Sequence, residues 1–378
     1  MYNNFYYKQK TTIFFGEQSI EKIKELSLQG KTLVLYGGNY ILKLNIIDNI
    51  KSLISEENLI IVSDCPTNPS NIDVEAISNQ YKNENIQNII AIGGGSVIDL
   101  AKALSIYYLS DSNSYIDMVK TRNINKSLNL LTITTNPSSG SEVNNTFVIT
   151  DANTGNKMAM GTDFTYPIAT FYDIGHMNTL TIGQISNSTA DILSHLLEQY
   201  FSSNDTTVFT DNLIISCIDT LITSYNELKN NINNDIAKQN FMLVAGYSLN
   251  YYLSIGKTLD WNAHQIEHCI SGKYKTPHTI GISIIYPNYL KYACENEIYN
   301  KKLLYINTKL FGTDYQQDPT LKLEEIFKSF KLPTKLSDLS DKININEITE
   351  LMFLEQKEIG KIYKLNPSIV TNILNECM

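Results

Sequence analysis

The stretch AIGGGSVIDLAK at residues 91–102 decides the fold of the first half of the chain. An apolar run that starts at residue 88 leads into three glycines and a serine, and a helical pattern follows directly. Glycines let the backbone turn sharply and approach an anion closely, while the start of a helix presents N–H groups and a positive dipole end. The order of strand, glycine turn and helix favours a phosphate-binding turn over a plain strand-to-helix connection, which is the alternative.

Apolar β-type runs alternate with helical patterns on both sides of this stretch. The β-type runs lie at 32–36, 59–63 and 88–93, and helical patterns follow them at about 40–53, 72–83 and 97–109. This alternation predicts a parallel sheet flanked by helices. Further β-rich runs lie at 128–134, 146–150 and 167–172, with a turn signal at 153–155 between the last two.

The pattern changes at Ile182. Stretches with helical spacing and almost no strand signal follow at about 184–202, 207–229, 235–255, 260–272 and 280–297. We therefore predict an α/β protein: an N-terminal Rossmann-like parallel-sheet domain at residues 1–182, followed by an all-helical domain at residues 183–378.

A second glycine turn, Gly37-Gly38, follows the run at 32–36. Together with Gly93, Gly94, Gly95, Ser96 and Asp99 it predicts a dinucleotide site. NAD sites often place an acidic residue at a strand end to hold the ribose 2′-hydroxyl, and this turn has none. The missing acid leaves room for a 2′-phosphate, so NADP(H) is favoured over NAD(H).

Four of the five histidines fall into two clusters. Asp191 and His195 are four residues apart, as are His264 and His268, and His278 follows soon after. Residues at this spacing share a helix face. Asp191, His195, His264 and His278 together predict a site for a first-row divalent ion such as Fe(II) or Zn(II), although histidines of a helical core are the alternative. We expect His176 to lie at the surface or in a helix cap, outside this site.

Composition narrows the function further. The net charge is -9 with no basic run, and Arg122 is the single arginine, so nucleic acid is an unsuitable partner. The five cysteines are scattered and lack metal-site spacing, which indicates a reducing compartment. Because we find neither a signal peptide nor a bilayer-spanning apolar stretch, we expect a cytoplasmic protein.

Taken together, the motifs resemble the iron-containing alcohol dehydrogenase family, in its butanol dehydrogenase and NADPH-dependent aldehyde reductase branch. The resemblance spans nearly the whole chain. It rests on FFGEQSI (14–20), the 93–102 motif, PSSGSEVN (137–144), NSTADILSHLLEQY (187–200) and WNAHQIEHCISGKYKTPH (261–278).

The resemblance implies a role for particular residues. Asp191, His195, His264 and His278 match the metal ligands of the family, and His268 matches a histidine near the substrate that helps to move the proton. The residues that match the cofactor site are Ser139, Ser141, Asn144 and Lys157. The last of these matches a lysine beside NADPH, and the family also implies a homodimer.

The expected function is the metal-dependent interconversion of small primary alcohols and aldehydes with NAD(P)H. Two alternatives remain open: a glycerol-type polyol dehydrogenase on the same scaffold, and a non-catalytic metal- or nucleotide-binding relative. Apolar residues at 247–255 and Trp261 are candidates for the substrate pocket, although core positions are the commoner use of such residues.

Overall fold

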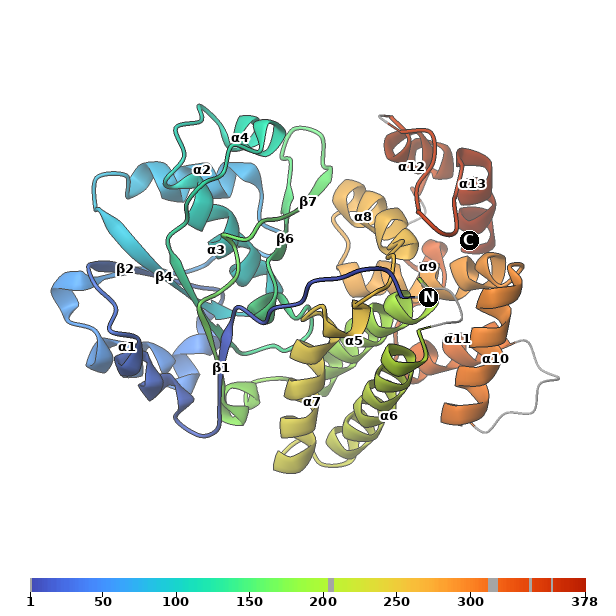
Figure 1. The fold of residues 1–378 in the computed structure, drawn as a ribbon, viewed down its shortest axis with the longest axis horizontal. Coiled ribbons are helices and arrows are strands. Elements are labelled where there is room, and N and C mark those ends of the chain that lie inside the picture. Colours follow the sequence, from blue (N-terminus) through green and yellow to red (C-terminus); the bar gives the residue numbers. More distant parts are fainter. Residues whose placement is uncertain (1, 203–206, 312–318, 340–341, 355) are drawn as a thin grey trace. The chain divides into compact units, whose positions relative to one another are not determined.

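The computed structural model describes residues 2–202, 207–311, 319–339, 342–354 and 356–378 (Figure 1). Contacts between Cα atoms divide the chain into two compact units. The sheet unit comprises Lys8–Thr181 and Asn231–Asn250, and the helical unit comprises Met1–Tyr7, Ile182–Asn230 and Tyr251–Met378. The helical unit resumes at Ile182, where the sequence pattern changes, whereas residues 231–250 group with the sheet unit. The division into domains at 182/183 stays a prediction.

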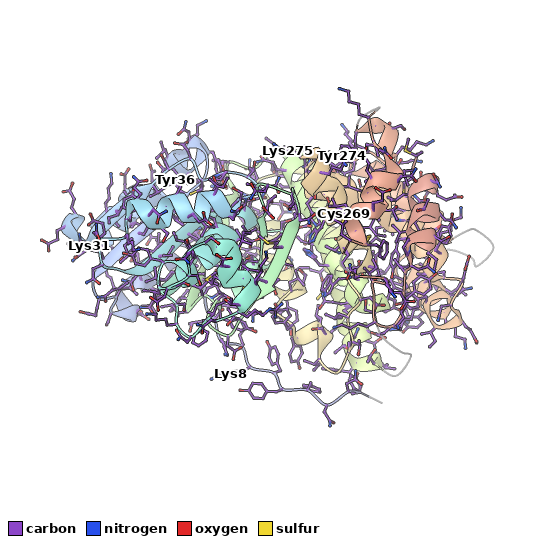
Figure 2. All side chains as sticks on the ribbon, turned by 90° about the horizontal axis from the view of Figure 1, so that it is seen from above. Lys8, Lys31, Tyr36, Cys269, Tyr274 and Lys275 are labelled. Atoms are coloured by element: carbon purple, nitrogen blue, oxygen red, sulfur yellow. The ribbon has the colours of Figure 1, made fainter. Side chains whose placement is uncertain are left out.

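A parallel sheet forms the centre of the sheet unit, as the alternating pattern predicts. Its strands, in spatial order, are β1 (Thr12–Phe15), β8 (Ala169–Tyr172), β5 (Asn129–Thr134), β4 (Ile86–Gly93), β2 (Lys31–Tyr36) and β3 (Leu59–Val62). Every pair of neighbours is parallel. Lys31 and Tyr36, labelled in Figure 2, mark the two ends of β2.

Three strands differ from the expectation. The run at 146–150 forms β6 (Thr146–Thr150), but β6 pairs in an antiparallel hairpin with β7 (Lys157–Gly161), outside the main sheet. Neither β7 nor the edge strand β1 was expected. The sequence of β7, KMAMG, lacks β-branched and aromatic residues, so its strand conformation comes from pairing with β6 rather than from propensity.

Helices cover both faces of the sheet. Leu33 and Leu35 pack in one apolar cluster with α3, whereas Val34 and Tyr36 pack in another with α1, because successive side chains of a strand point to opposite faces. The helices of this unit are α1 (Ile46–Leu53), α2 (Asn71–Gln80), α3 (Gly95–Tyr107), α4 (Tyr115–Thr121) and α7 (Asp235–Ser248). Short 3₁₀ segments are η1 (Ser19–Leu26), η2 (Asn39–Leu44), η3 (Glu56–Asn58), η4 (Ser141–Val143) and η5 (Ile174–Met177).

The two glycine turns lie next to each other at the carboxyl ends of the neighbouring strands β2 and β4. β2 pairs with β3 on one side and with β4 on the other, and Tyr36 lies opposite Ile92 in the β2–β4 pair. The connections therefore leave β2 and β4 in opposite directions. Open parallel sheets bind ligands at such a reversal of strand order, outside the carboxyl ends of the strands. Gly37 and Gly93 occupy this position.

The described part of the helical unit consists mainly of helices, which confirms the expected fold class. Its α-helices are α5 (Ile182–Phe201), α6 (Val208–Asn230), α8 (Asn262–Tyr274), α9 (His278–Ala293), α10 (Glu297–Phe311), α11 (Pro319–Ser329), α12 (Ile345–Met352) and α13 (Pro367–Glu376), with 3₁₀ segments η6 (Tyr252–Ser254) and η7 (Leu336–Asp338).

One expected helix is shorter than its pattern. The apolar pattern at 235–255 continues beyond α7, but α7 ends at Ser248 and Tyr251 adopts a left-handed backbone conformation with φ of 68°. The chain leaves the helix already at the C-cap, Leu249, whose φ of -130° and ψ of 24° are not helical. Among the described residues, no helix is long and apolar enough to cross a membrane.

Candidate active site

The glycine turn joins β4 to α3 in very little space. Gly93 ends the strand, and Gly94 precedes α3 as an N-cap without a side-chain hydrogen bond. A β-carbon on Gly93 would lie 2.8 Å from Val97 Cγ2, and one on Gly95 would lie 2.6 Å from Ser139 Oγ. A side chain at Gly93, where φ is 158°, would be strained, and one at Gly95 would displace the Ser139 hydroxyl, so glycine suits both positions of this turn.

A buried lysine ties α3 to the loop that faces this turn. Lys102 Nζ donates to Ser141 Oγ (2.8 Å), Asn144 Oδ1 (3.1 Å) and the Thr146 carbonyl (2.8 Å). Ser141 Oγ in turn donates to Asp99 Oδ1 (2.7 Å). The predicted residues Asp99, Ser141 and Asn144 are therefore brought together in one network.

Burial dominates the protonation of this network. It lowers the pKa of Lys102 to about 7, although Asp99 and Glu142 act in the opposite direction. Burial likewise raises the pKa of Asp99, against the lowering effect of Lys102, Ser141 and the Val148 N–H. Glu142, whose pKa burial also raises, accepts a hydrogen bond from Tyr172 Oη at 2.8 Å.

The other predicted cofactor residues lie around the same turn. Lys157 is the first residue of β7, half-buried, and its charge lowers the pKa of Asp99, so the two side chains are neighbours. Ser139 Oγ accepts a hydrogen bond from the Ser141 N–H (3.3 Å), and Ser96 Oγ accepts one from the Asn68 N–H (3.4 Å).

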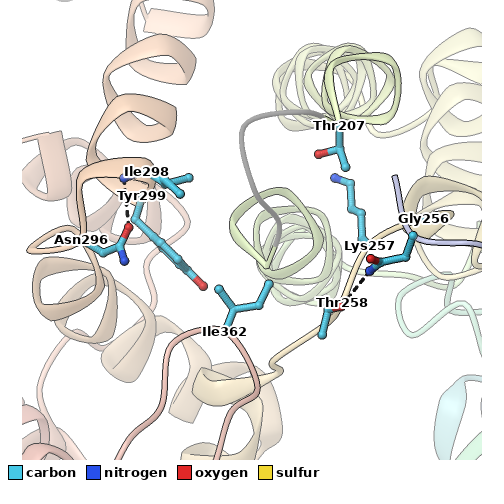
Figure 3. A pocket seen from close by; sticks show the side chains of 9 residues that line it. Thr207, Gly256, Lys257, Thr258, Asn296, Ile298, Tyr299 and Ile362 are labelled. Atoms are coloured by element: carbon cyan, nitrogen blue, oxygen red, sulfur yellow. Dashed lines mark hydrogen bonds between the residues drawn. The ribbon is translucent and has the colours of Figure 1, made fainter. Parts of the chain in front are cut away.

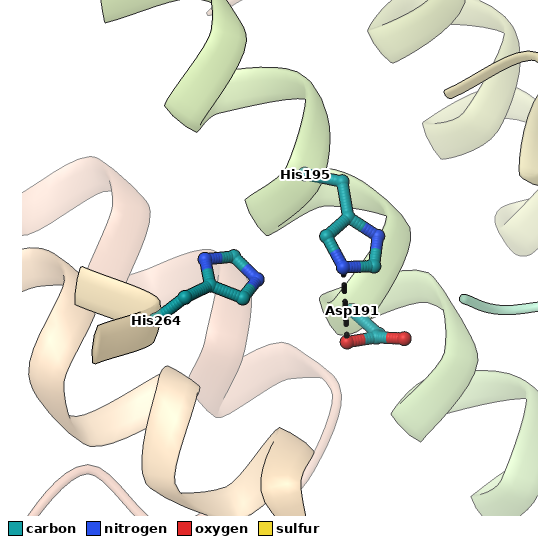
Figure 4. Close-up of side chains that lie close together, drawn as sticks. All are labelled: Asp191, His195 and His264. Atoms are coloured by element: carbon teal, nitrogen blue, oxygen red, sulfur yellow. Dashed lines mark ion pairs between the residues drawn. The ribbon is translucent and has the colours of Figure 1, made fainter. Parts of the chain in front are cut away.

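Three of the predicted metal ligands form a buried cluster in the helical unit. Asp191 and His195 lie one turn apart on α5, and His264 lies on the first turn of α8 (Figure 4). His195 Nε2 is 3.8 Å from Asp191 Oδ1, and the rings of His195 and His264 stack with their centroids 5.0 Å apart. One ligand atom from each residue lies within 4.8 Å of the others.

The fourth predicted ligand lies next to this cluster, on a third helix. His278 is the first residue of α9, and its Nε2 lies 3.6 Å from Asp191 Oδ1. Its ring centroid is 5.3 Å from that of His264. Three helices that are distant in sequence thus place His278 beside the cluster of Asp191, His195 and His264, and one ion held by all four side chains stays a prediction.

The quartet fits a first-row divalent ion. Ligand atoms of a tetrahedral site with bonds of about 2.0 Å lie about 3.3 Å apart, close to the separations at Asp191 Oδ1. Burial lowers the pKa of His195 to about 4, which keeps its imidazole neutral, as metal binding requires. His264 Nε2 is buried and has no hydrogen-bond partner among the described residues. Such a nitrogen is suited to a metal bond.

Two carboxylates beside the quartet were missed at the level of sequence. Glu198 Oε1 lies 3.3 Å from His264 Nδ1, and Glu267 Oε2 contacts His278 Nδ1. A signal existed, because Glu198 follows His195 by three residues and Glu267 follows His264 by three. This spacing places each on the face of its helix that carries a ligand.

His268 and Trp261 lie close to the quartet. The ring of His268 is 5.3 Å from that of His278. Trp261 packs edge-on against His264, with centroids 5.1 Å apart, so it contacts a predicted ligand. His176 was expected at the surface or in a cap, but it is buried in η5, where Asp173 supplies the cap by accepting the Gly175 N–H.

A pocket of about 240 Å³ also opens in the helical unit (Figure 3). Its lining includes Lys257, Asn296 and Tyr299, and it contains none of the predicted ligands. The Lys257 ammonium is already engaged with Asp211 at 2.6 Å. The predicted metal ligands therefore do not line this pocket.

Comparison with known proteins covers both parts of the chain. Residues 10–174 match the family described as Iron-containing alcohol dehydrogenase, and residues 185–378 match Fe-containing alcohol dehydrogenase family, C-terminal. A Bacillus subtilis (strain 168) protein named Probable NADH-dependent butanol dehydrogenase 2 is 28% identical over 384 residues, covering 98% of each chain. The NADPH-dependent aldehyde reductase YqhD of Escherichia coli (strain K12) is 24% identical over 349 residues, covering 89% of each. The crystal structure of NADH-dependent butanol dehydrogenase A from Thermotoga maritima superposes with a TM-score of 0.91 at 25% identity, covering 99% of this chain and 98% of that one.

Proposed function

Because the chain belongs to the iron-containing alcohol dehydrogenase family, we propose that it interconverts small primary alcohols and aldehydes, using a nicotinamide dinucleotide and one divalent metal ion. The family and the oxidoreductase class expected from the sequence are confirmed by these matches. The observation that carries the metal-dependent proposal is the buried cluster of Asp191, His195 and His264, to which His278 adds a fourth ligand.

We propose Fe(II) or Zn(II) as the ion, held by these four side chains. Three neutral imidazoles and one carboxylate suit either ion and do not suit Ca²⁺ or Mg²⁺. When bound, such an ion supplies a Lewis acid that polarises the substrate carbonyl. The chain contributes a fixed ligand geometry, because the quartet comes from three helices packed into one core.

His268 is proposed as the group that moves the proton. Reduction of an aldehyde adds a hydride to carbon and a proton to oxygen, and an imidazole titrates close enough to neutrality to supply that proton. His268 lies one turn beyond His264, and its ring is partly exposed beside His278. It can therefore exchange protons with solvent between turnovers.

The proposed cofactor site is the glycine turn with its facing loop. Gly93, Gly94, Gly95 and Ser96 would cradle the diphosphate, with Asp99, Ser139, Ser141, Asn144 and Lys157 around it. We propose a preference for NADP(H), because Gly37, Gly38 and Asn39 after β2 carry no carboxylate to repel a 2′-phosphate. The Bacillus relative is named NADH-dependent and the Escherichia coli relative NADPH-dependent, so direct competition between the two nucleotides tests this preference.

We also propose a homodimer that works in the cytoplasm. β1 lies at the edge of the sheet and exposes 44% of Ile13 and 42% of Phe15, an apolar edge that a second copy would cover. None of the five cysteines forms a disulfide, as expected in a reducing compartment. Light scattering that finds only the 42.8 kDa chain would contradict the dimer.

The test is a turnover assay on protein stripped of metal and reloaded anaerobically with Fe(II) or Zn(II). Butanal and NADPH or NADH are added, and loss of the near-ultraviolet absorbance of the reduced nicotinamide is followed. We expect loss only with metal, and faster loss with NADPH. Equal rates in stripped protein would overturn the metal-dependent mechanism, and oxidation of glycerol in preference to butanol would favour the polyol alternative.

A further inference from the structure

Two buried glutamates each contact one of the proposed histidine ligands. Glu198 is 2% exposed and Glu267 is fully buried. Each contacts the Nδ1 atom of one histidine: Glu198 that of His264, at 3.3 Å, and Glu267 that of His278. The contacted nitrogen is in each case not the one that faces the centre of the quartet.

Glu198 is fixed by the start of α8 as well as by the histidine. Its Oε1 accepts the backbone N–H groups of Ala263 (2.8 Å) and His264 (3.3 Å). Trp261, the N-cap of α8, provides no side-chain hydrogen bond there. One carboxylate on α5 therefore satisfies the first turn of α8 and orients the ring of His264 at the same time.

Glu267 reaches His278 only because residue 281 is glycine. A β-carbon on Gly281 would lie 2.6 Å from Glu267 Cγ and 2.7 Å from Glu267 Oε1. Contacts this short do not occur between a side chain and a fixed neighbour. The missing side chain on α9 thus makes the space in which the carboxylate meets His278.

We propose that Glu198 and Glu267 are positioning residues for the metal site: each accepts the Nδ1–H of its histidine and so holds the Nε2 lone pair toward the ion. An Nδ1–H donor fixes the neutral tautomer with a bare Nε2, and the carboxylate makes that nitrogen a stronger ligand. His264 Nε2 is the buried nitrogen without a hydrogen-bond partner among the described residues, and His278 Nε2 points to Asp191 Oδ1 at 3.6 Å. This inference rests on the proposed metal-binding function and deepens it.

A second arrangement would make Glu267 itself a metal ligand. Glu267, His268 and His278 offer ligand atoms that lie within 4.8 Å of one another, so Glu267 could bind a second ion directly. The contact between Glu267 and His278 Nδ1 favours the positioning role. If Nδ1 donates its hydrogen to the carboxylate, only Nε2 of His278 is left to bind a metal, and Nε2 lies on the side of Asp191. The stoichiometry of binding distinguishes the two.

The test measures metal affinity rather than turnover. The single tryptophan, Trp261, lies 5.1 Å from the His264 ring, so its fluorescence reports Co(II) at the quartet. Full-length Glu267→Gln, Glu198→Gln and Gly281→Ala are titrated with Co(II) against a competing chelator. Visible absorption of the bound Co(II) reports its coordination. Glu376→Gln, which removes an exposed carboxylate paired with Lys291 on α9, is the matched control.

We expect Glu267→Gln and Glu198→Gln to raise the dissociation constant by about 10- to 100-fold, the usual effect of losing an outer carboxylate. Gly281→Ala should raise it similarly while leaving every ligand and both glutamates in place. The control should bind as the wild type does. Altered Co(II) spectra with unchanged circular dichroism would separate positioning from unfolding.

Each other outcome counts against a distinct claim. Wild-type protein that binds no Co(II) refutes the proposed metal-dependent function. Wild-type binding with unaltered affinity and spectrum in all three variants refutes the positioning role alone. Two ions in the wild type and one in Glu267→Gln would make Glu267 a ligand and overturn the inference.

Discussion

Gly95, the first residue of α3, packs so closely against Ser139 that a β-carbon at residue 95 would stand 2.6 Å from Ser139 Oγ. Ser139 Oγ in turn accepts the Ser141 N–H, and Ser141 belongs to the Lys102 network. The glycine turn and the facing loop therefore share one contact surface. A larger side chain at residue 95 would therefore displace Ser139 and, through it, the facing loop.

Gly95→Ala should weaken nucleotide binding. The new methyl group displaces Ser139 and narrows the turn, so we expect the dissociation constant of NADPH to rise about tenfold, equivalent to about 1.4 kcal/mol. Calorimetric titration measures it. Gly161→Ala is the control, since a β-carbon there meets its neighbours at 3.4 Å, an ordinary contact. Unaltered affinity in Gly95→Ala would remove the turn from the proposed cofactor site.

Lys102 should make stability depend on pH. Burial lowers its pKa to about 7 in the folded chain, against 10.5 for an ordinary lysine side chain. Between these values the unfolded chain binds more protons, so stability rises with pH. We expect the free energy of unfolding of the wild type to rise relative to that of Lys102→Met between pH 7 and about 9.5, by at most about 1.4 kcal/mol per pH unit.

Urea unfolding of both proteins across this range measures the difference. The comparison with Lys102→Met cancels the titration of groups outside the network. Burial raises the pKa of the neighbouring Asp99 and Glu142 carboxyls, whereas the charge of Lys102 lowers both. A difference in stability that stays constant from pH 7 to about 9.5 would show that Lys102 keeps its ordinary pKa.

Local patterns predicted the elements that propensity and periodicity specify, and missed those that depend on tertiary contacts. The glycine turn after β4 and the i, i+4 pair Asp191–His195 are local features, and both lie where the pattern indicated. The contact of Glu198 with His264 joins residues 66 positions apart. Likewise β7 exists through its pairing with β6. The partner of Glu198 cannot be read from a short window of sequence, and β7, KMAMG, carries no strand pattern of its own although a turn signal precedes it.

His268→Ala should lower turnover without removing the metal. Loss of a positioned proton donor costs at least about a hundredfold in kcat, while the four proposed ligands remain. Metal content by atomic emission and Co(II) titration of Trp261 fluorescence should match the wild type. Loss of the metal from His268→Ala would show that His268 is a ligand. Full turnover of this variant would show that another group supplies the proton.

Removal of the metal should destabilise the helical unit. The quartet joins α5, α8 and α9, so an ion that binds only the folded chain stabilises it by RT ln(1 + [M]/Kd), about 4 kcal/mol at roughly a thousand times Kd. Calorimetry with and without chelator measures this as a fall in Tm. Without chelator, Asp191→Asn should already have the Tm of the metal-free wild type, and chelator should change its Tm little. A neutral amide oxygen is a much weaker ligand than the carboxylate it replaces. A chelator effect as large in Asp191→Asn as in the wild type would place the stabilising ion elsewhere in the chain.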